Sequence, residues 1–278
     1  MEQKFDLENK FFIYLPGMLE LINNKTFRPR EWKKINTNLE EHINDRRKII
    51  TRDNYLRAET NIYDIIIGVI EGKTSPYSYF QYLQILFKQL TKNLTVEERK
   101  KLRPTLYSVL INLDHKYRNF IGELSVLNNI RENNKNYRLI RVDKDIIVDE
   151  KKADFTFENV DTKEIELIEV VNIHAYETPE GFDLKRFVVG KIEDKIRIKT
   201  SGKSDYRSFK LVPVFWGEIE NMKKLNGIFK HEKVELADNV FEPLSLCSFV
   251  GPDFPVHRFV KISELFTDGP IEVIPYDR

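Results

Sequence analysis

The sequence predicts an α/β protein in which a mostly helical N-terminal region precedes a domain with a central mixed sheet flanked by helices. Helical patterns fill the chain before residue 105, and strand and helix patterns mix after it. Two strand patterns, 165–173 and 210–216, are apolar enough to be buried. We therefore expect a helical region over residues 1–104 and an α/β domain over residues 105–278.

Two patterns define helices in the first region. The segment SPYSYFQYLQILFKQL, residues 75–90, begins with serine and proline and carries apolar residues at helical spacing. Thr95 and Glu98 have the spacing of a capping box, which predicts that a helix starts there. The basic segment 44–57 fits either a solvated helix face or a surface that contacts phosphates.

The second region follows the order helix, strand, strand, strand, helix, strand. The expected elements are a long helix over 104–133, a strand at 137–142, a turn near 142–152, a hairpin within 153–177, a helix over 182–199, a strand at 208–217, a short helix near 218–226 and weaker strands that include 244–250. Such mixing after a helical half favours an α/β domain.

Composition limits the class of protein. The chain has 278 residues, 41% of them hydrophobic and 12% aromatic, which suffices for a packed core and argues against disorder. The single cysteine, Cys247, excludes an internal disulfide framework and favours a reducing compartment. No apolar run approaches the roughly 20 residues of a membrane span, and the N-terminus does not resemble a signal peptide. We expect a cytoplasmic protein that has no membrane partner.

Charge is unevenly distributed, although the net charge is only +1. Residues 1–110 are net basic and residues 111–278 are net acidic. This split is compatible with one face for a polyanion and another for a cation, or with ordinary surface variation. The histidines show no metal-ligand spacing with Cys247, and neither a phosphate-binding loop nor a dinucleotide fingerprint occurs.

Carboxylates interrupt apolar faces in the second region. Glu123 falls at the edge of a helical apolar stripe, Asp154 opens a strand, and Glu169 lies within the buried strand 165–173. Ionised carboxylates are rarely buried unless they are paired or bound to metal. Adjacent strands can bring Asp154 and Glu169 within a few ångströms. With Glu123 they would supply three hard oxygen ligands for Mg²⁺ or Mn²⁺.

Two lysines, Lys191 and Lys195, fall near the middle of an apolar face on the helix that follows. The apolar residues of that face are Leu184, Phe187, Val188, Ile192, Ile196 and Ile198. Long lysine stems can cover apolar surface while their ammonium groups reach water. Because buried lysines need an anion or a shifted pKa, we expect at least one of the two to pair with the inward carboxylates.

At these residues the chain resembles the PD-(D/E)xK nuclease superfamily, whose restriction-endonuclease-like core has a helix, three strands, a helix and a strand. GEL matches the helix acid at Glu123, AD matches the aspartate at Asp154 with alanine in place of proline, and EVV matches the strand acid at Glu169. The resemblance covers roughly residues 105–220. It implies a metal-dependent nuclease in which these three acids bind Mg²⁺ or Mn²⁺.

The chain departs from the family pattern at Val171, which stands where the lysine of the strand is expected. Some members supply this lysine from the next helix, and either Lys191, our first expectation, or Lys195 would then serve. A bulge in the strand would put Glu166 in the place of Glu169. We prefer Glu169 because it shares its face with apolar neighbours in a sheet that is buried on both sides.

The resemblance implies hydrolysis of phosphodiester bonds in nucleic acid, with DNA favoured over RNA. The alternatives are a non-catalytic nuclease-fold protein that binds or acts as a scaffold, and an interaction protein in which the charges form structural ion pairs. The helical region would position nucleic acid, bind a protein partner or form a homodimer. His174 and Tyr176 follow the strand and are weaker candidates for substrate contact.

Overall fold

The chain forms two compact units, an N-terminal unit, Met1–Ile168, and a C-terminal unit, Glu169–Arg278. The computed structural model describes residues 15–22, 27–49, 61–65, 74–112, 116–142, 153–175, 181–200, 209–217, 219–231, 244–250 and 255–261. Its helices and strands give the mixed α/β class that the sequence predicts. The predicted boundary between residues 104 and 105 does not follow this division by compactness, and it stays a prediction.

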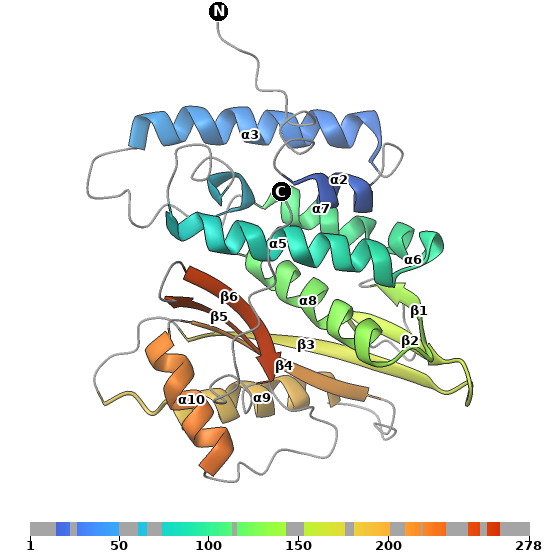
Figure 1. Ribbon diagram of the computed structural model, residues 1–278, viewed down its shortest axis with the longest axis vertical. Helices are drawn as coiled ribbons and strands as arrows, with labels where there is room; N and C mark the ends of the chain where they lie inside the picture. Colours follow the sequence, from blue (N-terminus) through green and yellow to red (C-terminus); the bar gives the residue numbers. More distant parts are fainter. Residues whose placement is uncertain are drawn as a thin grey trace, which may run out of the picture. The chain divides into compact units, whose positions relative to one another are not determined.

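The N-terminal unit begins with helices alone in its described part before residue 137. These are α2 (Pro16–Ile22), α3 (Pro29–Ile49), α5 (Thr74–Asn93), α6 (Val96–Lys101), α7 (Arg103–Ile111) and α8 (Tyr117–Asn133), and residues 62–65 form a further helical turn. Helix α2 packs against α5, and both α5 and α7 pack against α8. Figure 1 shows these helices in blue and green, with the axes of α3 and α5 nearly parallel and their chains running in opposite directions.

Helix α5 shows why this part of the chain is helical. Its buried residues Leu83, Phe87 and Leu90 recur at helical spacing, so they form one apolar stripe. The expected helix over 75–90 is therefore confirmed.

The expected long helix over 104–133 is wrong in one respect, because α7 and α8 are separate helices. Asn112 adopts an extended conformation after α7, with φ −83° and ψ 114°. Its backbone N–H and its side-chain Nδ2 both donate to the Ser108 carbonyl oxygen, at 3.2 and 2.5 Å. A side chain that bonds the preceding turn in this way competes with continuation of the helix.

Helix α6 confirms the predicted capping box and also closes a sheet edge. The Thr95 hydroxyl accepts a hydrogen bond from the Glu98 backbone N–H, and the Glu98 carboxylate accepts one from the Thr95 backbone N–H. Glu98 Oε1 also accepts the Leu139 N–H at 2.8 Å, while Lys101 Nζ donates to the Leu139 carbonyl at 2.8 Å. Both backbone groups at this position of the first strand are thus occupied by α6, which blocks pairing with another strand there.

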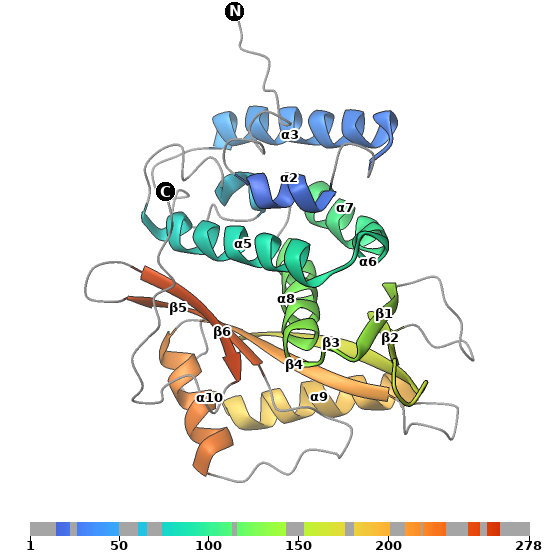
Figure 2. The ribbon, with the colours of Figure 1, turned by 45° about the vertical axis from the view of Figure 1, so that its right-hand side comes forward.

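Three strands follow α8 as an antiparallel meander. They are β1 (Tyr137–Val142), β2 (Phe155–Asn159) and β3 (Ile165–Ala175). The register between β2 and β3 is regular and includes the Cα partners Phe155 and Ile168. An irregularity occurs instead between β1 and β2, near Leu139. Figure 2 shows β1 and β2 to the right of α8. The turn expected after residue 142 lies outside the described residues.

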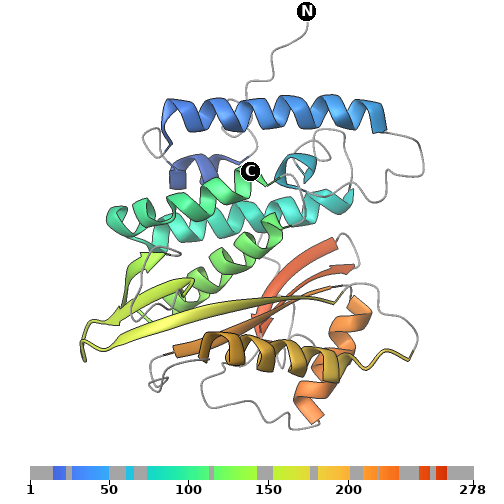
Figure 3. The ribbon, with the colours of Figure 1, turned by 180° about the vertical axis from the view of Figure 1, so that it is seen from behind.

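The C-terminal unit contains a mixed sheet with helices on one face. Its strand order is β3, β4 (Phe209–Gly217), β5 (Leu244–Val250) and β6 (Pro255–Lys261). Strand β5 is parallel to β4 and antiparallel to β6. Helices α9 (Leu184–Thr200) and α10 (Ile219–His231) lie on the same side of these strands in all the ribbon views (Figures 1, 2 and 3).

The two strands predicted to be buried form the core of this sheet. Residues 168–171 of β3 and 211–216 of β4 are buried without alternation. Continuous burial of this kind is typical of strands in the interior of a sheet, and these buried residues are apolar except for Glu169. Within the described part of the chain, no helix combines the length and apolar character needed to cross a membrane.

Candidate functional site

Glu169 lies in the middle of β3 and is 2% exposed, which makes it the buried acid of the strand. Lys195, on α9, places its Nζ atom 2.7 Å from Glu169 Oε1. Burying an unpaired carboxylate would cost several kcal/mol, so the ammonium group offsets the desolvation of this acid. The Lys195 side chain is 32% exposed, so the pair is buried on the side of the acid and reaches solvent on the side of the lysine.

The alternation of β3 places Glu169 among apolar neighbours. Leu167, Val171 and Ile173 share its face, because side chains two residues apart in a strand point the same way. Val171 and Ile173 are both buried. The position where the resemblance expects a lysine is therefore apolar, and α9 supplies the ammonium group to this face instead.

Lys191 occupies a different environment from Lys195. It is exposed, and its Nζ atom lies 5.7 Å from the centre of the Phe187 ring. The expectation that Lys191 falls near the middle of a core-facing stripe is wrong, while its expected role as the lysine of the site stays a prediction. The buried stripe of α9 consists of Leu184, Val188 and Ile192, and it is narrower than the apolar pattern in the sequence.

Ile198 also lies outside the buried stripe of α9. It is 66% exposed, although the sequence pattern assigns it to the apolar face. The helix therefore leaves part of that face, including Phe187 and Lys191, outside the core.

Glu166 has its own partner within the N-terminal unit. The Tyr137 hydroxyl donates to Glu166 Oε1 at 2.8 Å. Burial, together with this hydrogen bond and the nearby negative charge, raises the pKa of Tyr137 to about 12. Glu166 and Glu169 are three residues apart and so point to opposite faces of β3. The regular register between β2 and β3 contains no bulge that would exchange them, which favours Glu169 as the site acid.

The opposite face of β3 carries a polar and aromatic cluster. Trp216 Nε1, on β4, donates to Asn172 Oδ1 at 2.7 Å. The rings of His174 and Trp216 stack, with centroids 5.8 Å apart and an interplanar angle of 20°. His174 therefore lies on the other face from Glu169, where Trp216 holds its ring. Tyr176 lies outside the described residues.

The other two predicted metal ligands belong to the N-terminal unit. Glu123 is half-buried on α8, between the buried residues Gly122 and Leu124. Asp154 is half-buried and immediately precedes β2. Their convergence with Glu169 would involve both units and stays a prediction. Within the described ranges, no three His, Cys, Asp or Glu side chains lie close enough together to hold a metal ion.

Two features of the site region were not predicted from the sequence. One is the contact of Trp216 with Asn172 and His174. The other is the contact of Lys191 with Phe187, for which a spacing of four residues on a helix is the available signal. No family model, no curated protein and no solved structure matches the chain.

Proposed function

We propose that the chain is a metal-dependent nuclease with a restriction-endonuclease-like core, which hydrolyses phosphodiester bonds in nucleic acid and favours DNA over RNA. The observation that supports this proposal best is the contact between Glu169 and Lys195. A lysine amine beside the strand acid is the feature that separates a catalytic member from an inactive one. The following helix provides that amine where Val171 replaces the expected lysine.

The order of elements supports the same proposal. Helix α8, strands β1 to β3, helix α9 and strand β4 follow one another as helix, three strands, helix and strand. This is the order that the resemblance implies for the core. The matching acids occur on α8, just before β2 and within β3.

Chain connectivity also supports a shared role for Asp154 and Glu169. Asp154 precedes Phe155 by one residue and Glu169 follows Ile168 by one, and Phe155 and Ile168 are Cα partners. Given the spacing of consecutive and of paired Cα atoms, the backbone limits the Asp154 to Glu169 Cα distance to about 13 Å. Continuation of the ladder by one residue would put the two acids opposite each other on one face.

The proposed roles follow from the chemistry of the side chains. Glu123, Asp154 and Glu169 would hold Mg²⁺ or Mn²⁺, since hard cations prefer carboxylate oxygens. When bound, the ion acts as a Lewis acid and lowers the pKa of a coordinated water. Lys195 would orient the attacking water and stabilise negative charge on a phosphoryl oxygen. Its partial exposure leaves the ammonium group accessible to a phosphate from solvent.

A non-catalytic nuclease-fold protein is the second candidate. Two observations favour it: the apolar residue at Val171, and the lack of a three-ligand metal group among the side chains that the structure describes. This candidate predicts that the protein binds nucleic acid and never cleaves it.

A degradation assay separates the two candidates. Purified full-length protein is incubated with plasmid DNA, single-stranded DNA and RNA in the presence of Mg²⁺, Mn²⁺ or EDTA. The nuclease proposal predicts cleavage that needs a divalent ion and is abolished by Asp154→Ala. The matched control is Asp161→Ala, an exposed acid in the turn that follows β2. Binding without cleavage under every divalent ion would favour the second candidate instead.

A further inference from the structure

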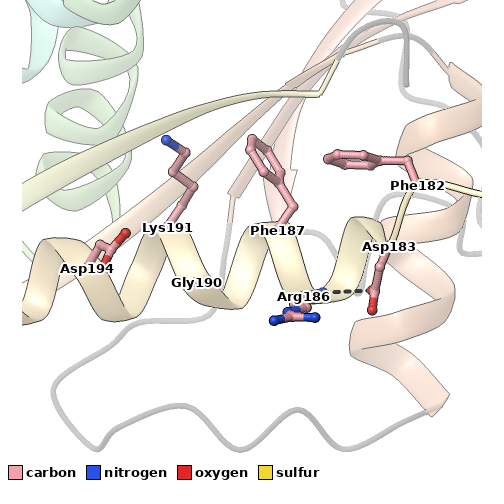
Figure 4. Close-up of a pocket in the computed structure, with 7 residues that line it drawn as sticks. All are labelled: Phe182, Asp183, Arg186, Phe187, Gly190, Lys191 and Asp194. Carbon is pink, nitrogen blue, oxygen red and sulfur yellow. Dashed lines mark hydrogen bonds between the residues drawn. The ribbon is translucent and has the colours of Figure 1, made fainter. Parts of the chain in front are cut away.

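A groove on α9 lies outside the Glu169 site. Its volume is about 400 Å³, and it is lined by Phe182, Asp183, Arg186, Phe187, Gly190, Lys191 and Asp194. Figure 4 shows Phe182, Phe187 and Lys191 projecting to the same side of the helix. The lining residues come from 186–194 of α9 and the two residues before the helix, so one short segment builds the groove.

The groove displays two aromatic rings. Phe182 is 41% exposed, and its ring centre lies 5.3 Å from that of Phe187. At Gly190 a Cβ atom would meet no atom within 4 Å, so the surface of the groove is open at this residue. Exposed aromatic rings that line a surface opening offer apolar contact area to a ligand.

The side chains that line the groove carry a small net positive charge. Asp183 Oδ1 accepts the backbone N–H of Arg186 at 2.9 Å, and Asp194 Oδ1 accepts a hydrogen bond from Arg197 at 2.7 Å. Asp194 is therefore balanced by Arg197, whereas Asp183 keeps its negative charge, so Arg186 and Lys191 leave the lining with a net charge of about +1. Among the side chains that the structure describes, neither Arg186 nor Lys191 forms an ion pair with a carboxylate. This balance favours an anionic ligand.

We propose that the groove binds an unpaired nucleotide of single-stranded nucleic acid, with its base against Phe187 and Phe182 and its phosphate near Lys191. Stacking on aromatic rings beside cationic side chains is how proteins hold single strands without reading sequence. A base inside a duplex is already stacked and paired, so this groove selects a single-stranded segment. The proposal rests on the proposed nuclease function and defines its substrate class.

The position of the groove relates it to the candidate active site. Phe187, Lys191 and Lys195 follow one another at four-residue spacing along α9. Eight residues of helix span about 12 Å, which matches three to four stacked nucleotides at about 3.4 Å each. The groove would therefore hold a nucleotide a few positions away from the scissile phosphate beside Lys195.

The test measures binding of a fluorescent oligonucleotide to the full chain in EDTA, by anisotropy, as a single strand and as a duplex. Phe187→Leu keeps an apolar side chain but removes the ring, and we expect it to weaken single-strand binding about 5- to 100-fold. Phe187→Trp should retain or increase the affinity. Ile198→Leu, on the exposed surface of the same helix, is the matched control and should bind like the parent. Circular dichroism checks that each variant is folded.

A second variant tests the phosphate contact. Lys191→Ala should weaken binding and reduce the salt dependence by about one released ion, while Lys224→Ala, an exposed lysine on α10, should leave both unchanged. Equal affinity of the parent and Phe187→Leu for the single strand would overturn the proposal, as would an absence of nucleic-acid binding. Binding is measured without metal, so it does not depend on cleavage. A parent protein that binds through Phe187 but never cleaves would support the proposed binding groove and refute the proposed nuclease activity. A parent that cleaves while Phe187→Leu binds normally refutes the groove alone.

Discussion

Lys195 Nζ lies 2.7 Å from Glu169 Oε1, so a lysine from α9 faces the buried acid of the strand that precedes the helix. The contact explains how an ionised carboxylate is tolerated at 2% exposure within an otherwise apolar strand. In the proposed nuclease, Lys195 would take the role of the lysine that the resemblance expects at Val171, 24 positions earlier in the chain. Stability and catalysis should therefore both depend on this pair.

The first prediction concerns stability. Glu169→Gln and Lys195→Met should each lower the free energy of unfolding by about 1–3 kcal/mol, because each leaves the partner imperfectly paired. The double variant should lose less than the sum, since neither charge then remains without its partner. Urea denaturation of the four proteins measures the coupling energy. Additive effects, within about 0.5 kcal/mol, would show that the contact is energetically unimportant.

The second prediction concerns which acid of β3 is used. If the proposed nuclease is correct, Glu169→Gln should reduce cleavage with Mg²⁺ by about 100-fold or more, because it removes a proposed metal ligand and the partner of Lys195. Glu166→Gln should retain most of the activity, because this acid hydrogen bonds to Tyr137 on the opposite face. The initial cleavage rates of the two variants on the same plasmid show which acid is used. Comparable losses in both variants would mean that the assignment of Glu169 is wrong.

The third prediction compares two adjacent acids on α6. Glu98→Gln should lower the free energy of unfolding by about 1–3 kcal/mol, since Glu98 is buried and accepts hydrogen bonds from Thr95 and Leu139. Glu97→Gln is the control, because Glu97 is exposed and contacts only Lys100 in the described structure. Hydrogen exchange at the Leu139 amide should accelerate in Glu98→Gln alone. Unchanged exchange there would show that Glu98 does not protect the edge of β1.

The fourth prediction concerns pH. Burial alone would raise the pKa of Glu31, but the hydrogen bonds from Arg103 and from the Arg28 backbone, with the charges of both arginines, lower it below its ordinary value of 4.5. A carboxylate whose pKa is lowered in the folded protein stabilises the folded state above pH 4.5. This stabilisation is lost as the pH falls through the pKa of the carboxylate in the folded state. Glu31→Gln should therefore be less stable than the parent by about 0.5–1 kcal/mol at pH 7.

The difference between Glu31→Gln and the parent should shrink steadily below pH 4.5. Thermal unfolding at a series of pH values between 3 and 7 measures it. A stability difference between the two proteins that is constant across this pH range would show that the ionised form of Glu31 is not what stabilises the fold.

Much of the fold could be predicted because its elements carry strong local patterns. The buried strand around Phe215 is continuously apolar, the strand around Val171 is mostly apolar, and α5 has a clear helical stripe. The break between α7 and α8 could not be predicted, because the pattern continues across it. Only the hydrogen bonds that Asn112 makes to Ser108 reveal where the helix ends.

The candidate site could be predicted in part, for a similar reason. Alternation along β3 was sufficient to separate Glu169 from Glu166. Which of Lys191 and Lys195 faces Glu169 depends on how α9 is rotated about its own axis. The buried stripe of α9 contains fewer residues than the apolar pattern in the sequence indicates. Neighbouring positions on one helix face differ by only about 40° in direction, which sequence periodicity does not resolve.

Whether Lys195 acts in catalysis is decided by the Mg²⁺-dependent cleavage rate of Lys195→Met at saturating nucleic acid, compared with Lys191→Met, Lys224→Met and the parent. We expect Lys195→Met to lose about 100- to 1,000-fold in kcat, because the ammonium group that faces Glu169 is gone. Lys191→Met should instead lose affinity, and Lys224→Met should match the parent. A Lys195→Met protein that cleaves as fast as the parent would contradict the assignment of this lysine to catalysis.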